Sequence, residues 1–347
     1  MVRGFDVNQR MEHYHVSGLS MTMIRNGQIH KTETYGVLEV GTSTLVDQQT
    51  LFHACSISKF VSTMLVMKLA SQGILDLDED VNNRLTSWKV PHNTYTQAYK
   101  VTLRNLLSHQ AGIIDPENSF TELDPNTSIP IMMNLLTGNT PNCKESIIVK
   151  YEPGSEFHYS DAGFCIIQQL VEDVTGKPYD VTLDEHLFKP LQMSNSTILT
   201  SIPSGNSDGL ASGHHRNGDV VDGKYTIYPY PAAAGLWSTS TDLARLVIEF
   251  MDSIRGQSKI GISEKYAKEM ITSQGCREWT GLGVFLEGKG QDLEISSLGW
   301  GVGYQCMIVA NPYVETATVI MTNTDTGVHQ LEGLIGEIIR SESEVRF

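Results

Sequence analysis

The chain has 347 residues, of which 40% are hydrophobic and 19% are charged, as expected for a globular protein with one large domain or two that share a core. Its 40 acidic and 25 basic residues give a formal net charge of -15, which argues against nucleic acid and anionic membrane surfaces as partners. No apolar stretch approaches the ~20 residues that a membrane-spanning helix requires.

The N-terminal segment predicts a short helix followed by an antiparallel hairpin. Residues 5–16 form an amphipathic, charged stretch, which predicts a helix and not a secretory signal peptide. Residues 19–24 and 28–35 are alternating runs joined by Arg25-Asn26-Gly27, and Asn-Gly between such runs is the strongest local signal for a hairpin. Without a signal peptide, the protein is expected to be cytoplasmic as written, or exported if a leader has been removed.

A third strand at 50–52 leads into an apolar helix that begins near Ser56. The run from Phe60 to Ala70 is apolar nearly all round and stops at Gly73, so we expect this helix to be buried. Ser56 and Lys59 are three residues apart and therefore lie on the same helix face, one turn from each other.

Ser56 and Lys59 form the most informative pair in the sequence. Ser56 would lie in the first turn of the helix, where unpaired N–H groups and the helix dipole favour the negative charge of a nucleophile. A buried lysine must be paired or neutral, because burying an unpaired ammonium is costly; a neutral Lys59 beside a serine would be a base. Serine and lysine are common residues, so the pair indicates a catalytic site only together with further motifs.

The middle of the chain is predicted to be mainly helical, with Pro-, Gly- and Asn-rich loops between the helices. The predicted helices cover residues 103–107, 129–136, 163–174, 183–187, 243–250 and 264–271, and a loop is predicted at 201–222. The C-terminal part returns to strands at 306–310 and 316–322 and ends in a helix at 329–340.

These elements predict an α+β fold, because sequential strands joined by tight turns form an antiparallel sheet. The sheet, flanked by helices, is expected to be built from both ends of the chain, residues 1–75 and 235–347. Residues 76–234 are expected to form a mainly helical insertion. An active-site cleft is expected between the two parts.

Two further segments could complete a serine acyl-transfer site. Tyr159-Ser160-Asp161 lies on a loop just ahead of a predicted helix, where a tyrosine can act as a general base if nearby positive charge lowers its pKa. The glycine-rich segment from Ser297 to Tyr304 leads into a strand, and glycines let a backbone approach a ligand closely. There the N–H of Trp300 could pair with that of Ser56 as an oxyanion hole.

These three segments, in this order, resemble the motifs of the serine β-lactamase and penicillin-binding-protein superfamily. The resemblance is closest to its class C-like branch, which includes D,D-peptidases, D-aminopeptidases and family VIII esterases. It covers nearly the whole chain, because further segments match at the expected spacing. They are Leu103–Gly112, Tyr151–Tyr159, Thr175–Lys177, Pro190–Met193 and Gly235–Thr239.

The resemblance implies a β-lactamase/transpeptidase-like fold and a serine hydrolase that works without a cofactor or metal. Ser56 would be acylated, and Lys59 would accept its proton or supply the charge that keeps Tyr159 reactive. Tyr159 would protonate the leaving group and then activate the deacylating water. The N–H groups of Ser56 and Trp300 would hold the oxyanion, each worth on the order of 3 kcal/mol. The substrate would be a small molecule or peptide: a β-lactam, a D-amino-acid peptide or a small ester.

Two departures from the family pattern bear on the substrate. Asp161 stands where the second motif usually has asparagine, and a carboxylate can only accept hydrogen bonds. Ser297 stands where the third motif usually begins with lysine or histidine, which would bind a substrate carboxylate and help to acidify the tyrosine. We therefore expect a site, lined by Asp161, Ser297, Leu298 and Gly299, that favours neutral esters or amine-bearing D-peptides over penicillin-like substrates.

Other interpretations remain beside this one. The altered motifs leave room for a penicillin-binding or sensor protein with little or no turnover. A second register would place Trp300-Gly301 in the third motif, although it breaks the spacing to Gly303-Tyr304. Asp161 could cap the following helix. The oligomeric state stays open.

Several residues are expected to be structural. We expect His109 at a helix end, Cys55 in the core, and buried free thiols at the other cysteines, because no cysteine pair has zinc-site spacing; this favours a reducing compartment. Trp237 and Trp300 are expected in the core or in the cleft wall. Four histidines that lie close together in sequence as two pairs are expected to be solvated loop residues and not metal ligands. They are His13 with His15 and His214 with His215.

Overall fold

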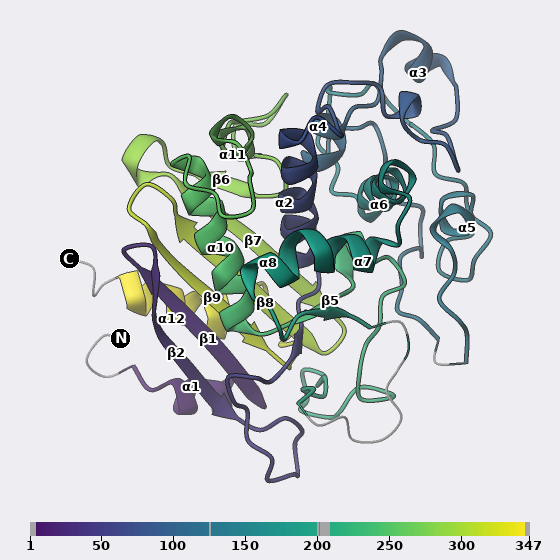
Figure 1. Cartoon of the computed structure of the whole chain (residues 1–347). Helices are drawn as coiled ribbons and strands as arrows, with labels where there is room; N and C mark the ends of the chain where they lie inside the picture. Colours follow the sequence, from purple (N-terminus) through teal and green to yellow (C-terminus); the bar gives the residue numbers. More distant parts are fainter. Residues whose placement is uncertain (1–4, 125, 200, 202–208, 344–347) are drawn as a thin grey trace.

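A computed structural model gives the structure of residues 5–124, 126–199, 201 and 209–343. A large antiparallel sheet and a group of helices lie side by side, and α2 (Ile57–Ser71) lies between them (Figure 1). The predicted α+β class is confirmed. Across the described residues, no helix is long and apolar enough to cross a membrane.

The large sheet has six strands in the order β2-β1-β9-β8-β7-β6. Every neighbouring pair is antiparallel, and β1 pairs with β9, so both ends of the chain meet inside the sheet as predicted. The strands are β1 (Gly18–Arg25), β2 (Gln28–Gly36), β6 (Phe285–Glu287), β7 (Glu294–Gly301), β8 (Tyr304–Asn311) and β9 (Thr316–Thr322).

The turn between β1 and β2 confirms the predicted hairpin. Its central residues, Asn26 and Gly27, have φ angles of 50° and 68°. A two-residue type I′ turn needs positive φ at both positions, which asparagine and glycine tolerate best. Arg25 pairs with Gln28 directly across the turn.

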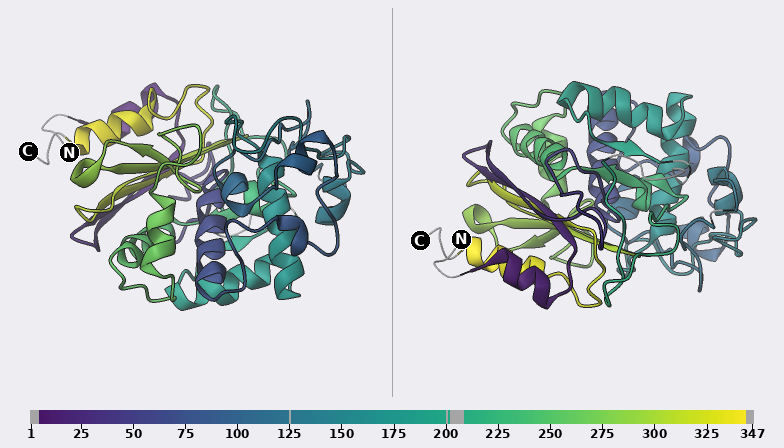
Figure 2. Two further views of the ribbon diagram at one scale, coloured as in Figure 1. Left: turned by 90° about the horizontal axis from the view of Figure 1, so that it is seen from above. Right: turned by 90° about the horizontal axis from the view of Figure 1, so that it is seen from below.

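Helices cover both faces of the large sheet (Figure 2). α1 (Val7–His13) and α12 (Leu334–Ser343) pack on one face, over a hydrophobic cluster that includes Met21. α10 (Ser240–Ile254) packs on the other face against β1 and β9, with α11 (Glu264–Met270) beside it. The sheet is therefore buried on both faces.

The remaining helices are α3 (Thr94–Ala98), α4 (Leu103–Leu107), α5 (Met132–Leu136), α6 (Asp161–Thr175), α7 (Tyr179–Leu183), α8 (Lys189–Leu191) and α9 (Pro231–Ala234), with a π-helical stretch at Asp184–Phe188 and a 3-10 turn at Val81–Asn83. A second 3-10 turn, at Gly290–Asp292, connects β6 with β7. The helix predicted at 183–187 is thus the middle of a longer helical run.

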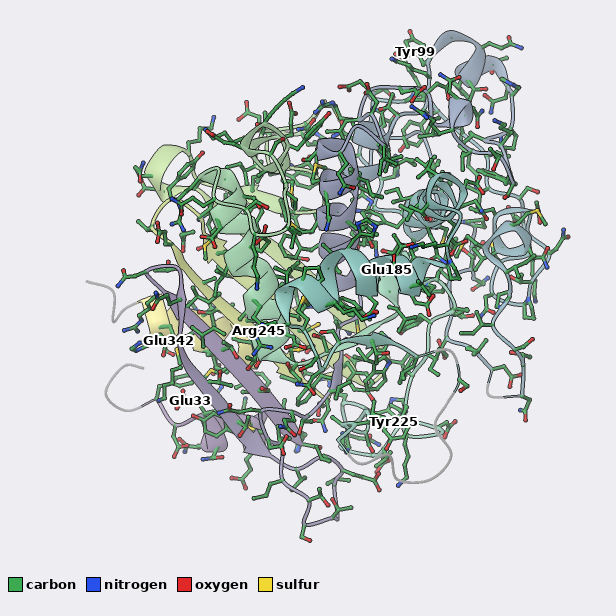
Figure 3. The ribbon with its side chains drawn as sticks, in the orientation of Figure 1. Glu33, Tyr99, Glu185, Tyr225, Arg245 and Glu342 are labelled. Carbon is green, nitrogen blue, oxygen red and sulfur yellow. The ribbon has the colours of Figure 1, made fainter. Side chains whose placement is uncertain are left out.

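Side chains fill the space between the sheet and the helices (Figure 3). One hydrophobic cluster extends through both, and it includes Phe250 from α10 and Leu170 from α6. α2 is at its centre, with every residue from 57 to 70 buried, as its apolar sequence predicted. The division into 1–75 with 235–347 and 76–234 stays a prediction.

The strand predicted at 50–52 belongs to a different sheet. It is β3 (Phe52–His53), which pairs with β5 (Leu236–Ser238), and β5 pairs in turn with β4 (Thr197–Ile198). Strands of two or three residues are too short to show an alternating pattern, so this second sheet was not predicted.

Two helices begin later in the sequence than predicted. α5 begins at Met132 and not at 129, because Pro130 disfavours a helical conformation in the residue before it and Ile131 is extended. α12 begins at Leu334, because a turn occupies 330–332. The predicted loop at 201–222 falls partly outside the described residues.

Two predictions about buried and exposed side chains were wrong. Cys276 is exposed, whereas Cys55 and the other three cysteines are buried free thiols. His214 is buried and not solvated, because its ring is fixed on both sides: Nδ1 lies 2.8 Å from the carbonyl oxygen of Asn323, and Nε2 accepts from the N–H of Val40. Trp237 is a core residue.

Candidate active site

Ser56 lies at the start of α2, directly after a sharp turn of the backbone. Cys55 has a φ of 47°, in the left-handed region that a non-glycine residue rarely adopts. Its N–H donates to Nδ1 of His53 at 2.9 Å, which helps to hold the turn. The Ser56 hydroxyl makes no capping bond to the helix, so it is available to the site.

Lys59 uses its ammonium group to connect three parts of the site. Nζ donates to Ser56 Oγ at 3.2 Å, to Asp161 Oδ1 at 2.5 Å and to the carbonyl oxygen of Ala233 at 3.0 Å. An ammonium has three donors, so all of them are engaged. The lysine side chain is 3% exposed.

The charge of Lys59 follows from these partners. Burial by itself would lower the pKa of the ammonium, but the negative charge of Asp161 and the contact with Tyr159 outweigh burial and raise the pKa above its usual range. The sequence analysis left two states open for a buried Lys59, a paired ammonium or a neutral amine. The ion pair with Asp161 identifies the paired ammonium as the state of Lys59.

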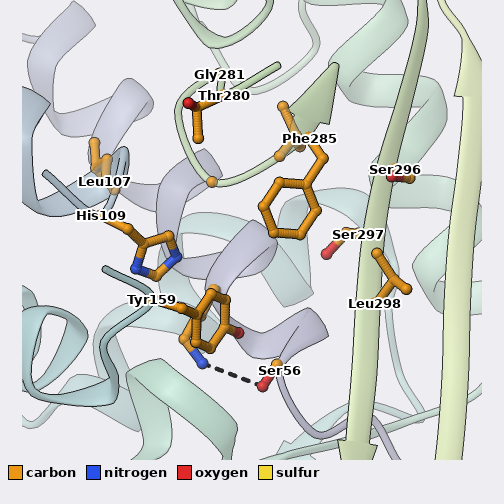
Figure 4. A pocket seen from close by; sticks show the side chains of 13 residues that line it. Ser56, Leu107, His109, Tyr159, Thr280, Gly281, Phe285, Ser296, Ser297 and Leu298 are labelled. Atoms are coloured by element: carbon orange, nitrogen blue, oxygen red, sulfur yellow. Dashed lines mark hydrogen bonds between the residues drawn. The ribbon is translucent and has the colours of Figure 1, made fainter. Parts of the chain in front are cut away.

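Tyr159 lies over this ammonium. The centre of its ring is 4.7 Å from Lys59 Nζ, within the range of a cation–π contact. The Tyr159 ring also stacks on the His109 ring, with centroids 4.3 Å apart and planes at 28°. The phenol oxygen points toward the side of the pocket that Ser297 lines (Figure 4). Ser56, Lys59 and Tyr159 thus meet at one place.

His109 ends α4, as expected, and it also borders the site, which the sequence did not indicate. Its φ of 58° turns the chain after the helix, and its Nδ1 accepts from the N–H of Ser160 at 3.1 Å. Burial and the charge of Lys59 lower the pKa of the His109 ring to about 3. The ring is therefore neutral and carries its proton on Nε2.

A carboxylate that the sequence analysis missed anchors the Tyr159 loop. Asp115 accepts hydrogen bonds from the Ser160 hydroxyl at 2.7 Å and from the N–H groups of Asp161 and Ala162 at 2.8 and 3.0 Å. Burial and the nearby charge of Asp161 raise the pKa of Asp115. Asp115 has no motif around it, so only the folded chain shows its role.

Asp161 does not cap α6, which is one of the two roles expected of it. The cap is Ser160, whose hydroxyl accepts from the N–H of Gly163 at 3.1 Å. Asp161 is the first residue of the helix, and its carboxylate turns back to Lys59. Its proposed contact with substrate stays a prediction.

β7 passes close to the nucleophile. A Cβ atom on Gly299 would lie 2.4 Å from the carbonyl oxygen of Ala54, so only glycine permits this approach. β6 pairs with β7 only as far as Ser296, which leaves the outer edge of β7 unpaired from Ser297 onward. In the tight hairpin to β8, alternate residues direct their N–H groups to opposite edges, and this alternation assigns the Trp300 N–H to the open edge.

The site opens into a small pocket with a cavity volume of about 20 Å³. Ser56, Lys59, Tyr159 and Ser297 line it together with Leu107, His109, Thr280, Gly281, Gly283, Val284, Phe285, Ser296 and Leu298 (Figure 4). Ser297 is buried at its wall. Catalytic and binding roles for these residues remain proposals.

Three predicted site residues lie outside this lining: Asp161, Gly299 and Trp300. The Trp300 side chain is 43% exposed, and its Nε1 donates to Asp325 at 2.8 Å. Leu298 lines the pocket, but its side chain packs with the cluster on the opposite face of the sheet. A substrate contact of Leu298 would therefore involve its backbone.

The His109 environment makes a prediction about acid stability. Because the pKa of His109 falls from 6.5 to about 3 in the folded protein, only the unfolded chain gains this proton as the pH drops below 6.5. The free energy of unfolding should therefore decrease as the pH is lowered from 6.5 to 3, by up to about 1.4 kcal/mol per pH unit. His109→Asn keeps an acceptor for Ser160 and should flatten this slope.

Urea unfolding at several pH values measures this slope. His92→Asn, at an exposed position, is the matched control and should keep the wild-type slope. Equal slopes in wild type and His109→Asn would contradict a neutral, buried His109.

Known proteins resemble this chain in sequence and in fold. The beta-lactamase family model matches residues 6–337. Protein flp of Staphylococcus aureus strain MW2 is 23% identical over 231 residues, which cover 65% of this chain and 44% of flp. The chain thus spans less than half the length of this curated relative.

Two solved structures show the same fold at 20% sequence identity. The octameric penicillin-binding protein homologue from Pyrococcus abyssi has a TM-score of 0.77 and covers 96% of this chain and 75% of its own. EstCE1, a hydrolase with promiscuous acyltransferase activity, has a TM-score of 0.74 and covers 95% of each chain. With a family model that matches nearly the whole sequence, the chain belongs to the beta-lactamase family.

Proposed function

We propose that the protein is a serine hydrolase that cleaves neutral esters or amides through an acyl-enzyme on Ser56. One observation carries the proposal: Lys59 Nζ contacts Ser56 Oγ at 3.2 Å, beside a pocket that Tyr159 also lines. The likeness to EstCE1, a hydrolase, supports the same reaction class. Family membership supports the acyl-enzyme.

In this proposal Tyr159 is the base and Lys59 is a fixed positive charge. Lys59 is already protonated, with its three donors engaged, so it has no lone pair to accept a proton from Ser56. Its charge lies 4.7 Å from the centre of the Tyr159 ring and stabilises negative charge on the phenol oxygen. Asp161 keeps Lys59 charged but also offsets part of the positive charge that Tyr159 experiences.

The reaction then has two halves. Tyr159 takes the proton of the Ser56 hydroxyl while Oγ attacks the substrate carbonyl, and the N–H groups of Ser56 and Trp300 stabilise the oxyanion. Tyr159 passes the proton to the leaving group as the bond to it breaks. In the second half, Tyr159 takes a proton from water, which attacks the acyl-enzyme, and returns it to Ser56.

The pocket favours a neutral substrate. Among the described residues that line it, Lys59 is the only lysine or arginine, and Asp161 already neutralises it. Ser297 offers a hydroxyl where the family pattern has a cation. A substrate carboxylate would therefore lose its water without gaining a charged partner, which is costly.

A substrate panel tests this proposal. We expect p-nitrophenyl acetate and N-acetyl-D-alaninamide, which are both neutral, to be cleaved with higher kcat/KM than a chromogenic cephalosporin or D-alanyl-D-alanine, which both carry a carboxylate. Ser297→Lys should raise kcat/KM for the two carboxylates by about ten- to hundredfold, as a charged hydrogen bond would. Ser297→Ala is the matched control and should not.

Two results would change the assignment. Cephalosporin turnover by the wild type as fast as ester turnover would contradict the preference for neutral substrates. A stable acyl adduct without turnover on every substrate would favour a penicillin-binding or sensor protein.

A further inference from the structure

The position of Tyr159 indicates which part of a substrate enters the pocket. In the proposed function, on which this inference rests, Tyr159 gives a proton to the leaving group, so the leaving atom must lie within hydrogen-bond reach of the phenol oxygen. That oxygen points toward Ser297 (Figure 4). The pocket between Tyr159 and β7 is therefore on the leaving-group side of the scissile bond, and the acyl part extends along β7 toward Trp300.

The aromatic ring of Phe285 lies on this leaving-group side of the pocket. Phe285 is the first residue of β6 and pairs with Ser296 of β7, so the sheet fixes its backbone. Its ring projects between Tyr159 and Ser297 into the pocket (Figure 4). This is the region that a long cationic side chain at position 297 would reach.

Two further aromatic residues hold the Phe285 ring in place. Trp279 lies 5.9 Å from it, centroid to centroid, and Phe157 lies 4.6 Å from Trp279 in an edge-to-face contact. The N–H of Leu286 also donates to the carbonyl oxygen of Trp279 at 2.8 Å. This aromatic row connects β6 with the loop of Tyr159, so movement of the Phe285 ring away from the pocket would break its contact with Trp279.

The loop around Gly283, which also lines the pocket beside Phe285, is held by close packing. A Cβ atom on Gly283 would lie 2.0 Å from the hydroxyl oxygen of Thr63 in α2, so this loop packs directly on the helix. Leu107 and Val284 complete the apolar lining. The pocket therefore has little capacity to widen around a large group.

We propose that Phe285 limits leaving-group size, and that the site takes esters and amides whose leaving group is a small uncharged alcohol, a single-ring phenol or a small amine. Bulky leaving groups would meet the ring, and charged ones would find no partner in the apolar wall. The acyl part of the substrate, on the other side of the scissile bond, does not meet Phe285.

Two series of esters test the leaving-group side and the acyl side of the scissile bond separately. In the first series the acyl group is always acetyl and the alcohol grows from ethanol to 2-naphthol; in the second the leaving group is always p-nitrophenol and the acyl chain grows from acetyl to hexanoyl. kcat/KM reports the acylation step in both. Phe285→Ala should raise the 2-naphthyl-to-ethyl ratio at least about tenfold, because each misfitting methylene in an apolar pocket is worth about 10–200-fold.

The same variant should leave the hexanoyl-to-acetyl ratio within about twofold of wild type, since a ratio measured with one leaving group cancels the effect of Phe285. Phe285→Leu keeps most of the volume and should give an intermediate leaving-group ratio. Tyr313→Ala removes an exposed aromatic ring outside the pocket and should change neither ratio.

An unchanged leaving-group ratio in both Phe285 variants, or an equal change in both series, would overturn the assignment while leaving the proposed hydrolase intact. No hydrolysis of any ester by the wild type, and no acyl adduct, would overturn the proposed function and this inference together.

Discussion

Replacing Lys59 by methionine should lower kcat/KM for a neutral ester by about 10²–10⁴-fold, the usual range for losing acid–base catalysis. The ammonium contacts both the Ser56 oxygen, at 3.2 Å, and the Tyr159 ring, at 4.7 Å from its centre, so it can stabilise negative charge on either residue during proton transfer. Methionine keeps the length and the apolar stem of the lysine but has no charge. Removing one partner of the Lys59–Asp161 ion pair should lower the free energy of unfolding by about 3–5 kcal/mol, so the fold of the variant is checked directly.

Lys68→Met is the matched control for this variant. Lys68 lies on the same helix, is also buried, and donates to the carbonyl oxygen of His186 at 2.9 Å, away from the pocket. Steady-state kinetics with p-nitrophenyl acetate, together with circular dichroism, should show a folded and inactive Lys59→Met beside an active Lys68→Met. A rate near that of wild type in Lys59→Met would refute its role.

Removing the phenol oxygen of Tyr159 should have a comparable effect. Tyr159→Phe keeps the ring that stacks on His109, and the side chain is 43% exposed, so stability should change by no more than about 0.5 kcal/mol. kcat/KM should fall by about 10²–10⁴-fold, because the proposed mechanism routes both proton transfers through this oxygen. Tyr95→Phe, at an exposed site on α3, should be as active as wild type.

This variant also separates the two candidate bases. If Lys59 accepted the proton of Ser56 directly, Tyr159→Phe would keep rapid acylation and lose only leaving-group protonation. It would then react normally with an ester of an acidic phenol, whose leaving group needs no proton. The proposed mechanism predicts slow acylation with that ester too.

The parts of the site that sequence analysis predicts best are those set by local geometry. Ser56 and Lys59 lie together because residues three apart share a helix face. The Asn26-Gly27 turn likewise follows from the φ angles that these residues tolerate. Such features need only a few neighbouring residues.

Contacts between distant segments were beyond prediction. Asp161 and Lys59 are 102 residues apart, and no periodicity indicates that the acid would decide the charge of the lysine. Asp115 and Phe285 are similar cases, because each is a single common residue without a motif. β7 as a whole strand was not predicted: its glycines marked only the segment from Ser297 to Tyr304, and its first residues alternate too weakly to mark a strand.

Burial of polar residues in loops was a further gap. His214 follows a Ser- and Gly-rich stretch, which usually indicates solvated loop, yet hydrogen bonds to Val40 and Asn323 let it be buried. Those partners lie far away in the sequence. A histidine in a polar loop therefore carries little information about its own exposure.

The central claim is that the Ser56 hydroxyl is an activated nucleophile, and covalent labelling tests it most directly. A fluorophosphonate ester should transfer its phosphonyl group to Ser56 Oγ with loss of fluoride. Intact-protein mass spectrometry should then show one adduct per chain, which peptide mapping places on Ser56. Ser56→Ala should take up none, and Ser155→Ala, at an exposed position, should be labelled like wild type. Folded wild-type protein that remains unlabelled, or a Ser56→Ala variant labelled as fast as wild type, would contradict the account.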